Sequence, residues 1–224
     1  MPLINVPPST DTTTGMLARL SFNFEPKKLG SSLAVFAKTV NDLTKLKAAK
    51  LLYFADKMHL LQYGRPITGD KYYCLDYGPV PTVSLNIMSD MISPFTVTLK
   101  GKRLEHPMRS TVEEYVTVGN KSARHPRIIA RKDSEIDSLT SAEQKVLTYI
   151  SQKYGQLSSS RLIELTHKER PWLKSNERRP EGSSVEIPWE YFFDESSPDT
   201  TPILSHVAEL AENRAFLKTL HEDL

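Results

Sequence analysis

The chain has 224 residues, of which 39% are hydrophobic and 25% are charged, a composition typical of a globular protein with one sizeable core. Its formal net charge of +2 is too balanced to indicate a nucleic-acid-binding protein. No apolar run approaches the roughly 20 residues needed to cross a bilayer, and the N-terminus lacks the basic and then apolar pattern of a secretory signal. The single cysteine, Cys74, forms no internal disulfide, and we expect a cytoplasmic protein.

The N-terminal part divides into three segments. Met1 to Gly15 is rich in Pro, Ser and Thr, and we expect it to be disordered on its own. Leu17 to Phe24 is apolar and is either an extra strand or a segment that orders on a partner. Pro26 to Val40 is predicted to be a helix, because four of its apolar residues follow spacings of four, three and four: Leu29, Leu33, Phe36 and Val40.

The central prediction is a long buried helix from Thr44 to Tyr63. Either Asp42 or Thr44 caps its start, and Gly64 ends it. Apolar residues surround most of its circumference, which is typical of a helix in a core rather than on a surface. The sequence leaves a narrow stripe for water, made of Lys47, Lys50 and Lys57.

Two rigid turns follow this helix. The segment 65–70 contains Pro66 and Gly69, so we expect the chain to reverse there with positive φ at Gly69. Lys71 to Leu75 is predicted to be a strand, and Tyr77 to Pro81 a second corner. Pro81 suits the first turn of another helix, with a buried stripe made of Leu85, Met88 and Ile92.

The middle of the chain favours strands. Phe95 to Leu99, Glu113 to Val118 and Arg127 to Ala130 have β-branched or aromatic content, and together with residues 71–75 they predict a small antiparallel sheet. The same region carries five cations, Lys121, Arg124, Arg127, Arg131 and Lys132. No aromatic residue is interleaved with them, which favours a solvated loop over a phosphate-binding patch.

The C-terminal part is mostly helical. Leu139 to Gly155 begins with a capping box, Thr140 to Glu143, and ends at Gly155 as the residue after the helix. A shorter helix runs from Ser159 to Thr166-His167, with Leu162, Ile163 and Leu165 facing inward, and Pro171-Trp172 breaks the pattern. Aromatic residues from Ile187 to Phe193 return to the core.

The last segment, Thr201 to Leu224, is predicted to be an amphipathic helix behind a polar linker. Its apolar stripe consists of Ile203, Val207, Leu210 and Leu217. Such a helix either folds back on the domain or docks on a partner. The whole sequence predicts a predominantly helical α+β fold in which further helices and a small antiparallel sheet pack around a central buried helix. The predicted parts are an N-terminal extension (1–24), a domain (25–194) and a linker with a C-terminal helix (195–224).

One group of residues has side chains that are typical of a catalytic metal site. Asp56 and His59 lie one turn apart, and Asp70 and His167 could join them in a metal site of a hydrolase. The alternative is structural, because a carboxylate on an apolar helix needs hydrogen-bond partners. Arg65, Lys71 and the hydroxyls of Tyr72 and Tyr73 are near in sequence, so we expect Asp56 to fix the 65–70 turn against the helix. The chain has none of the common metalloprotease, Walker or nucleophile-elbow motifs.

Two separated blocks of the sequence resemble a known family. The first reads KLLYFADKMHLLQYGRPITGDKYYCLDYGPVP, and the second contains Glu164-Leu165-Thr166-His167, Trp172-Leu173-Lys174 and Ile187-Pro188. Both resemble the Panacea domain of SocA-like antitoxins and phage-associated proteins. The resemblance spans roughly Pro26 to Phe193, although 93–136 shows no motif of the family.

The resemblance implies a cytoplasmic antitoxin of a toxin–antitoxin pair, with a role in phage defence. Such a protein binds its cognate toxin directly, uses no cofactor or metal and is not an enzyme. A variant of this reading is an adaptor that delivers the bound toxin to an ATP-dependent protease. The variable ends, 1–24 and 201–224, are then expected to give specificity. The residues expected to preserve or present the common surface are Asp56, Arg65, Asp70, Tyr77, Gly78 and His167.

Overall fold

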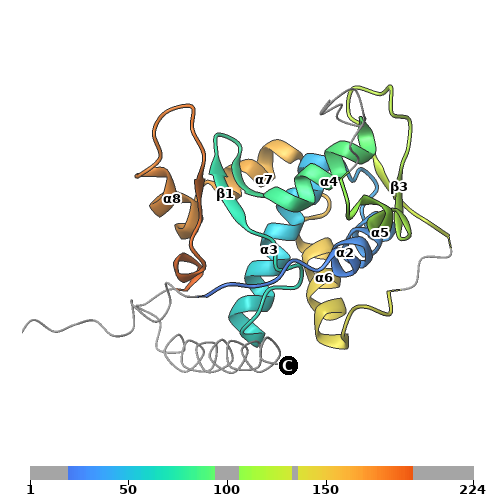
Figure 1. The fold of residues 1–224 in the computed structure, drawn as a ribbon, viewed down its shortest axis with the longest axis horizontal. Helices are drawn as coiled ribbons and strands as arrows, with labels where there is room; N and C mark the ends of the chain where they lie inside the picture. The colour runs from blue at the N-terminus through green and yellow to red at the C-terminus, as the bar shows by residue number, and fades with distance from the viewer. Residues whose placement is uncertain (1–19, 94–105, 133–135, 194–224) are drawn as a thin grey trace, which may run out of the picture.

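Helix α3, Lys45–Tyr63, runs through the middle of the computed structural model, which describes residues 20–93, 106–132 and 136–193 (Figure 1). Thr44 is its N-cap, and its hydroxyl accepts a hydrogen bond from the amide of Lys47. Gly64 ends the helix with a φ of 72°. A long helix with a local cap at each end is therefore confirmed, with Thr44 rather than Asp42 as the cap.

The prediction that three lysines of α3 face water is wrong for two of them. Lys47 and Lys50 are buried, and Lys57 is half-buried. The amine of Lys47 donates to the carbonyl of Gly155 at 3.2 Å, and the amine of Lys50 donates to the carbonyl of Pro79 at 2.8 Å. Long side chains bury their hydrocarbon stems and bring the amine to a carbonyl, so other elements cover this side of α3 as well.

Two helices pack beside α3. Helix α2, Pro26–Thr39, buries its apolar stripe, and helix α6, Ser141–Tyr154, contacts both α2 and α3. The capping box of α6 is present as predicted. Gly155 follows α6 with a φ of −62°, so it needs no left-handed conformation there.

The strands form two separate sheets rather than one. The first has the order β2-β1-β5 and is antiparallel, with β1 at Tyr72–Leu75, β2 at Gly78–Pro81 and β5 at Val185–Glu186. The second pairs β3, Val116–Val118, with β4, Ile128–Ala130, beside α2. The expected corner at Tyr77 to Pro81 is therefore largely strand β2. Two prolines fit there because β2 is an edge strand.

Four further α-helices belong to the described part of the chain. Helix α4 spans Thr82–Ile92, α5 spans Arg109–Glu113, α7 spans Ser159–Thr166 and α8 spans Arg170–Asn176. Helix α4 buries Met88 as predicted, but it also buries Ile87 and Met91 and leaves Leu85 and Ile92 half-exposed. Pro171 does not break a helix, because it lies in the first turn of α8, where its missing N–H costs nothing.

An aromatic cluster anchors the end of the domain as predicted. The 3₁₀ helix η1, Trp189–Phe192, places the ring of Phe192 5.7 Å from Tyr53 and the ring of Trp189 5.8 Å from Tyr72. Phe22 packs edge-on against Trp189 at 5.2 Å. The segment 20–24 therefore packs against the domain without forming a strand.

The fold is α+β and predominantly helical, which confirms the predicted class. In the ranges that the structure describes, no helix combines the length and apolar character required to cross a membrane. Three predicted features lie outside the described residues: the extension 1–15, the strand 95–99 and the helix 201–224.

Candidate functional site

Asp56 holds the turn that follows α3. Its side chain is fully buried, and its Oδ1 accepts hydrogen bonds from the amides of Ile67 at 2.8 Å and Thr68 at 2.9 Å. Its Oδ2 accepts from the hydroxyls of Thr68 and Tyr72. Burial raises the pKa of this carboxyl to about 6, against the effect of these donors, which favour the charged form. Asp56 thus binds the 65–70 turn to the central helix, as predicted.

Three of the predicted partners of Asp56 bind elsewhere. Lys71 and the hydroxyl of Tyr73 contact Glu186 on the neighbouring strand β5. Arg65 pairs with Glu143 of α6, with 2.7 Å between its Nη1 and the carboxylate oxygen. Their closeness in sequence to Asp56 was misleading, because Arg65 reaches α6 whereas Lys71 and Tyr73 reach strand β5.

Glu143 is a buried junction that sequence reasoning missed. Its carboxylate contacts Lys28 of α2 at 2.8 Å and Arg65 of the turn, and it accepts the Thr140 amide of its own capping box. Burial favours the neutral acid, but these hydrogen bonds and cations lower the pKa of Glu143 to about 2. The capping box predicts a local role for Glu143. Nothing in the neighbouring sequence indicates that Lys28 and Arg65, which lie far away in the chain, are its partners.

Asp70 fixes the start of α4. It is buried, and its two carboxylate oxygens accept the amides of Val83 at 3.1 Å and Ser84 at 2.7 Å. A carboxylate at this position satisfies otherwise unpaired amides and complements the helix dipole. Asp70 is therefore an N-terminal cap supplied from the preceding turn.

The two sequence blocks meet at Gly78. Its φ is 90°, and a Cβ at this position would lie 2.6 Å from the Thr166 hydroxyl and 2.8 Å from the Lys50 amine. Burial lowers the pKa of Lys50 to about 7. Next to Thr166, the ring of His167 stacks on Trp172 with 4.1 Å between ring centres, and burial together with the Lys50 charge lowers the pKa of this histidine. Only a glycine permits this close packing of β2 on α3 and α7.

The four residues of the metal hypothesis are held in different places. Asp56 binds the turn, Asp70 caps α4, and His167 stacks on Trp172. His59 lies with its Nδ1 2.7 Å from the carbonyl of Arg65. Among the described residues, no group of three or more His, Cys, Asp and Glu side chains is placed to hold a metal ion.

The tip of the β1–β2 hairpin is braced against α8. The indole of Trp172 donates to the carbonyl of Leu75 at 3.0 Å, and the guanidinium of Arg179 contacts Asp76 at 2.7 Å. Tyr77 at the tip is 68% exposed, and Leu173 on α8 is 45% exposed. We call Tyr77 and Leu173 the hairpin surface. It presents apolar side chains on a rigid support.

The predicted partner-binding residues therefore separate by burial. Asp56, Asp70 and Gly78 lie in the interior, and Arg65 and His167 are half-buried, whereas Tyr77 is exposed. The side chains of the interior residues are covered by the rest of the chain, so in this structure they offer no surface for direct contact. Four further predicted residues lie outside the described part of the chain: Ile203, Val207, Leu210 and Leu217.

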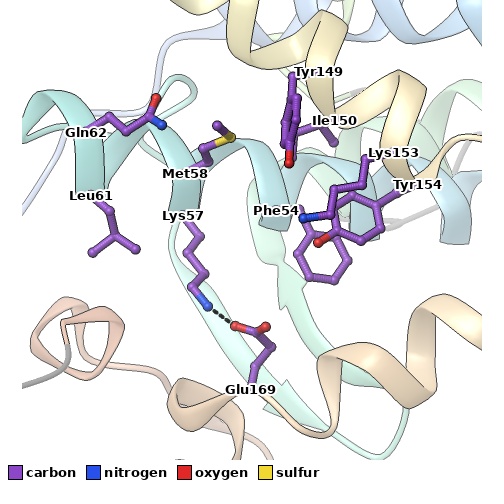
Figure 2. A pocket seen from close by; sticks show the side chains of 10 residues that line it. All are labelled: Phe54, Lys57, Met58, Leu61, Gln62, Tyr149, Ile150, Lys153, Tyr154 and Glu169. Atoms are coloured by element: carbon purple, nitrogen blue, oxygen red, sulfur yellow. Dashed lines mark hydrogen bonds and ion pairs between the residues drawn. The ribbon is translucent and has the colours of Figure 1, made fainter. Parts of the chain in front are cut away.

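A groove of about 270 Å³ lies between α3 and α6 (Figure 2). We call it the α3–α6 groove. Its lining residues are Phe54, Lys57, Met58, Leu61, Gln62, Tyr149, Ile150, Lys153, Tyr154 and Glu169. An ion pair between Lys57 and Glu169 closes one side, and the ring of Phe54 stacks on Tyr154 at 4.4 Å. Sequence reasoning missed this groove, although Phe54, Met58 and Leu61 follow helical spacing.

A second hollow, of about 750 Å³, borders the basic loop. Arg124, His125 and Arg127 line it together with the first residues of α3 and α7. Arg127 pairs with Asp42 at 2.7 Å, and Arg131 donates to the carbonyl of Glu113. All five cations of this region are exposed, in keeping with the expected solvated loop.

Comparison with known proteins identifies the family. No curated protein and no solved structure matches the chain. The family model described as "Antitoxin SocA-like, Panacea domain" matches residues 49–173, more than half of the 224 residues. This range begins in α3 and ends in α8, so it contains both the Asp56 turn and the Gly78 junction. The chain therefore belongs to the SocA-like antitoxin family and carries its Panacea domain.

Proposed function

We propose that this protein is an antitoxin that binds its cognate protein toxin directly and masks it in the cytoplasm, without a cofactor and without catalysing a reaction. The observation that carries the proposal is the family match over residues 49–173. The interior positions of Asp56, Asp70 and Gly78 support it as well. These residues stabilise a scaffold, and partner recognition is left to the outside.

The hairpin surface is the part of the described chain best suited to contact the toxin. Binding hot spots are enriched in tyrosine and cluster on well-supported surfaces. Tyr77 is a large and exposed tyrosine, and Trp172 and Arg179 fix the backbone on which it stands. Little conformational entropy is therefore lost when a partner covers it.

The first experiment is genetic. The adjacent reading frame is expressed alone, and then together with this chain. We expect growth to stop in the first case and to recover in the second, with a complex that co-purifies. A neighbour that does not impair growth, or a rescue without a complex, would contradict direct neutralisation.

The amount of toxin during the rescue separates masking from delivery. If the chain masks the toxin, the toxin persists at an unchanged level in an inactive complex. If the chain is an adaptor, the toxin level falls, and it recovers when the ATP-dependent proteases of the cell are deleted. The proposal of masking fails if rescue requires such a protease.

The second experiment tests the hairpin surface. Tyr77→Ala should weaken toxin binding by about 2 kcal/mol, the size of a hot-spot loss, with an unchanged melting temperature. Ile129→Ala is the control, because Ile129 is an exposed apolar residue of the other sheet. Equal toxin affinity in the wild type and the Tyr77 variant, measured by calorimetry, would remove this surface from the interface.

A further inference from the structure

We propose that the α3–α6 groove is the docking site of the C-terminal segment of the same chain, with Ile203, Val207 and Leu210 seated in it. This inference concerns the free protein and does not depend on the proposed function. It answers the question that the sequence leaves open, whether the last segment folds back or extends toward a partner.

The groove is apolar and open along a defined length. Phe54, Met58 and Leu61 line its α3 side at spacings of four and three, beside Lys57 and Gln62, and Phe54 forms a floor that is only 6% exposed. Seven residues of helix rise about 10.5 Å, so these three positions span about two turns of the groove, and Met58 and Leu61 are the partly exposed ones. Across the groove, the side chain of Tyr149 is 43% exposed. Figure 2 shows Met58 and Tyr149 bordering the same opening.

The C-terminal segment carries a stripe of the same spacing. Ile203, Val207 and Leu210 also follow intervals of four and three, so in a helix they span the same length of about 10.5 Å. Beyond them, Arg214 falls within about 40° of this stripe and interrupts it. The docking part is therefore 203–210, which matches the length of the α3 side. Two apolar ridges of equal spacing pack when one helix lies along the groove of others.

The described chain ends close enough for this segment to reach the groove. The ring of Phe192 lies 5.7 Å from that of Tyr53, and Phe54 at the groove is the next residue of α3. Phe193 and Ile203 are ten positions apart in the sequence, a distance that an extended chain spans over about 33 Å. A helix with its side chains is about 10–12 Å across, so the linker is long enough to pass around α3.

Charge at the rim of the groove favours the same occupant. The amine of Lys153 lies over the rings of Tyr149 and Tyr154, at 5.4 Å and 5.3 Å, and no carboxylate among the described residues pairs with it. Glu209 precedes Leu210 and so lies about 100° around the helix from it, on the flank of the stripe. A carboxylate at that position is placed to meet a cation on the rim.

Disulfide trapping in the full chain tests the contact. Met58→Cys is combined with Val207→Cys, and the control pair combines Lys121→Cys, in the basic loop, with Val207→Cys. The native Cys74 is buried, and burial raises the pKa of its thiol, so it stays unreactive. We expect the first pair to form an intramolecular disulfide at least about tenfold faster than the control, because docking raises the local concentration of the two thiols.

Footprinting with hydroxyl radicals supplies a readout that needs no cysteine. We expect oxidation of Met58 and Tyr149 to be about threefold faster in V207D/L210D than in the wild type, because the groove is then uncovered. Glu212→Gln, on the opposite face of the segment, is the matched control and should leave both rates unchanged. These substitutions lie at the groove, in the basic loop or in the last segment, and equal melting curves show that the core is intact.

Three outcomes would overturn the proposal. Equal disulfide rates in the two cysteine pairs would show that the segment does not visit the groove preferentially. Disulfide-linked dimers in place of monomers would assign the groove to a second copy of the chain. Equal footprints in the wild type and V207D/L210D would mean that these residues do not cover Met58 and Tyr149.

Discussion

Replacing Asp56 by alanine tests the structural role of the most conspicuous buried charge. The substitution leaves two backbone amides and two hydroxyls without their acceptor in a fully buried site. The hydroxyls of Thr68 and Tyr72 can rotate toward other groups, but the amides of Ile67 and Thr68 cannot. An unpaired buried donor costs about 1–3 kcal/mol, so we expect a loss of about 4 kcal/mol in the free energy of unfolding. A domain of this size is stable by about 5–15 kcal/mol, so the variant is close to its limit.

Asp56→Asn is the matched control, because it keeps the volume and one acceptor oxygen. That oxygen still serves the two amides, and the Asn NH₂ can donate to the two hydroxyls. We therefore expect it to lose less than about 2 kcal/mol. The assay is urea unfolding at pH 8, followed by tryptophan fluorescence, since Trp189 lies 5.8 Å from Tyr72.

The reasoning fails if Asp56→Ala unfolds within about 1 kcal/mol of the wild type, a difference smaller than the cost of one unpaired donor. An alanine variant that is fully folded but no longer binds the toxin would show that Asp56 belongs to the toxin interface rather than to the scaffold. Equal losses for alanine and asparagine would show that the negative charge matters, rather than the number of acceptors.

Three further substitutions test the packing and the pKa shifts. Gly69→Val should lower the free energy of unfolding, measured by thermal melts, by about 2 kcal/mol, because φ is +69° and the new Cβ would collide with the Asn23 carbonyl. Gly182→Ala is the control and should cost less, because a Cβ there enters open space. The pKa of Glu143, about 2, lies below its unfolded value, so the stability that this residue gives the fold is lost as pH falls from 4.5 through 2. An acid titration of Glu143→Gln should lack this loss. Burial lowers the pKa of Lys50 to about 7, below its unfolded value, so wild-type stability should rise as pH increases from 7 to 9. Thermal melts of Lys50→Met should lack this rise.

Elements with local signals were predictable from the sequence. Thr44 and Gly64 mark the two ends of α3, and the capping box at Thr140 marks the start of α6, because each of these signals acts within one turn of helix. Asp56 was also identified correctly, since an unpaired carboxylate on an apolar helix requires partners close to it.

Features that join distant parts of the chain were not predictable in the same way. Lys50 looked like a solvent-facing residue because the sequence does not show that β2 and α7 cover it. The role of Glu143 depends on Lys28, 115 residues away. The division of the strands into two sheets was missed because strand propensity does not specify pairing partners.

The interior position of Asp56, Asp70 and Gly78 has a consequence for protein engineering. Tyr77 and Leu173 are exposed, so we expect their exchange to leave the interior contacts of Asp56, Asp70 and Gly78 intact. Immunoglobulin frameworks accept grafted binding loops for the same reason. We therefore expect that new recognition residues can be introduced at these exposed positions while Asp56, Asp70 and Gly78 stay constant.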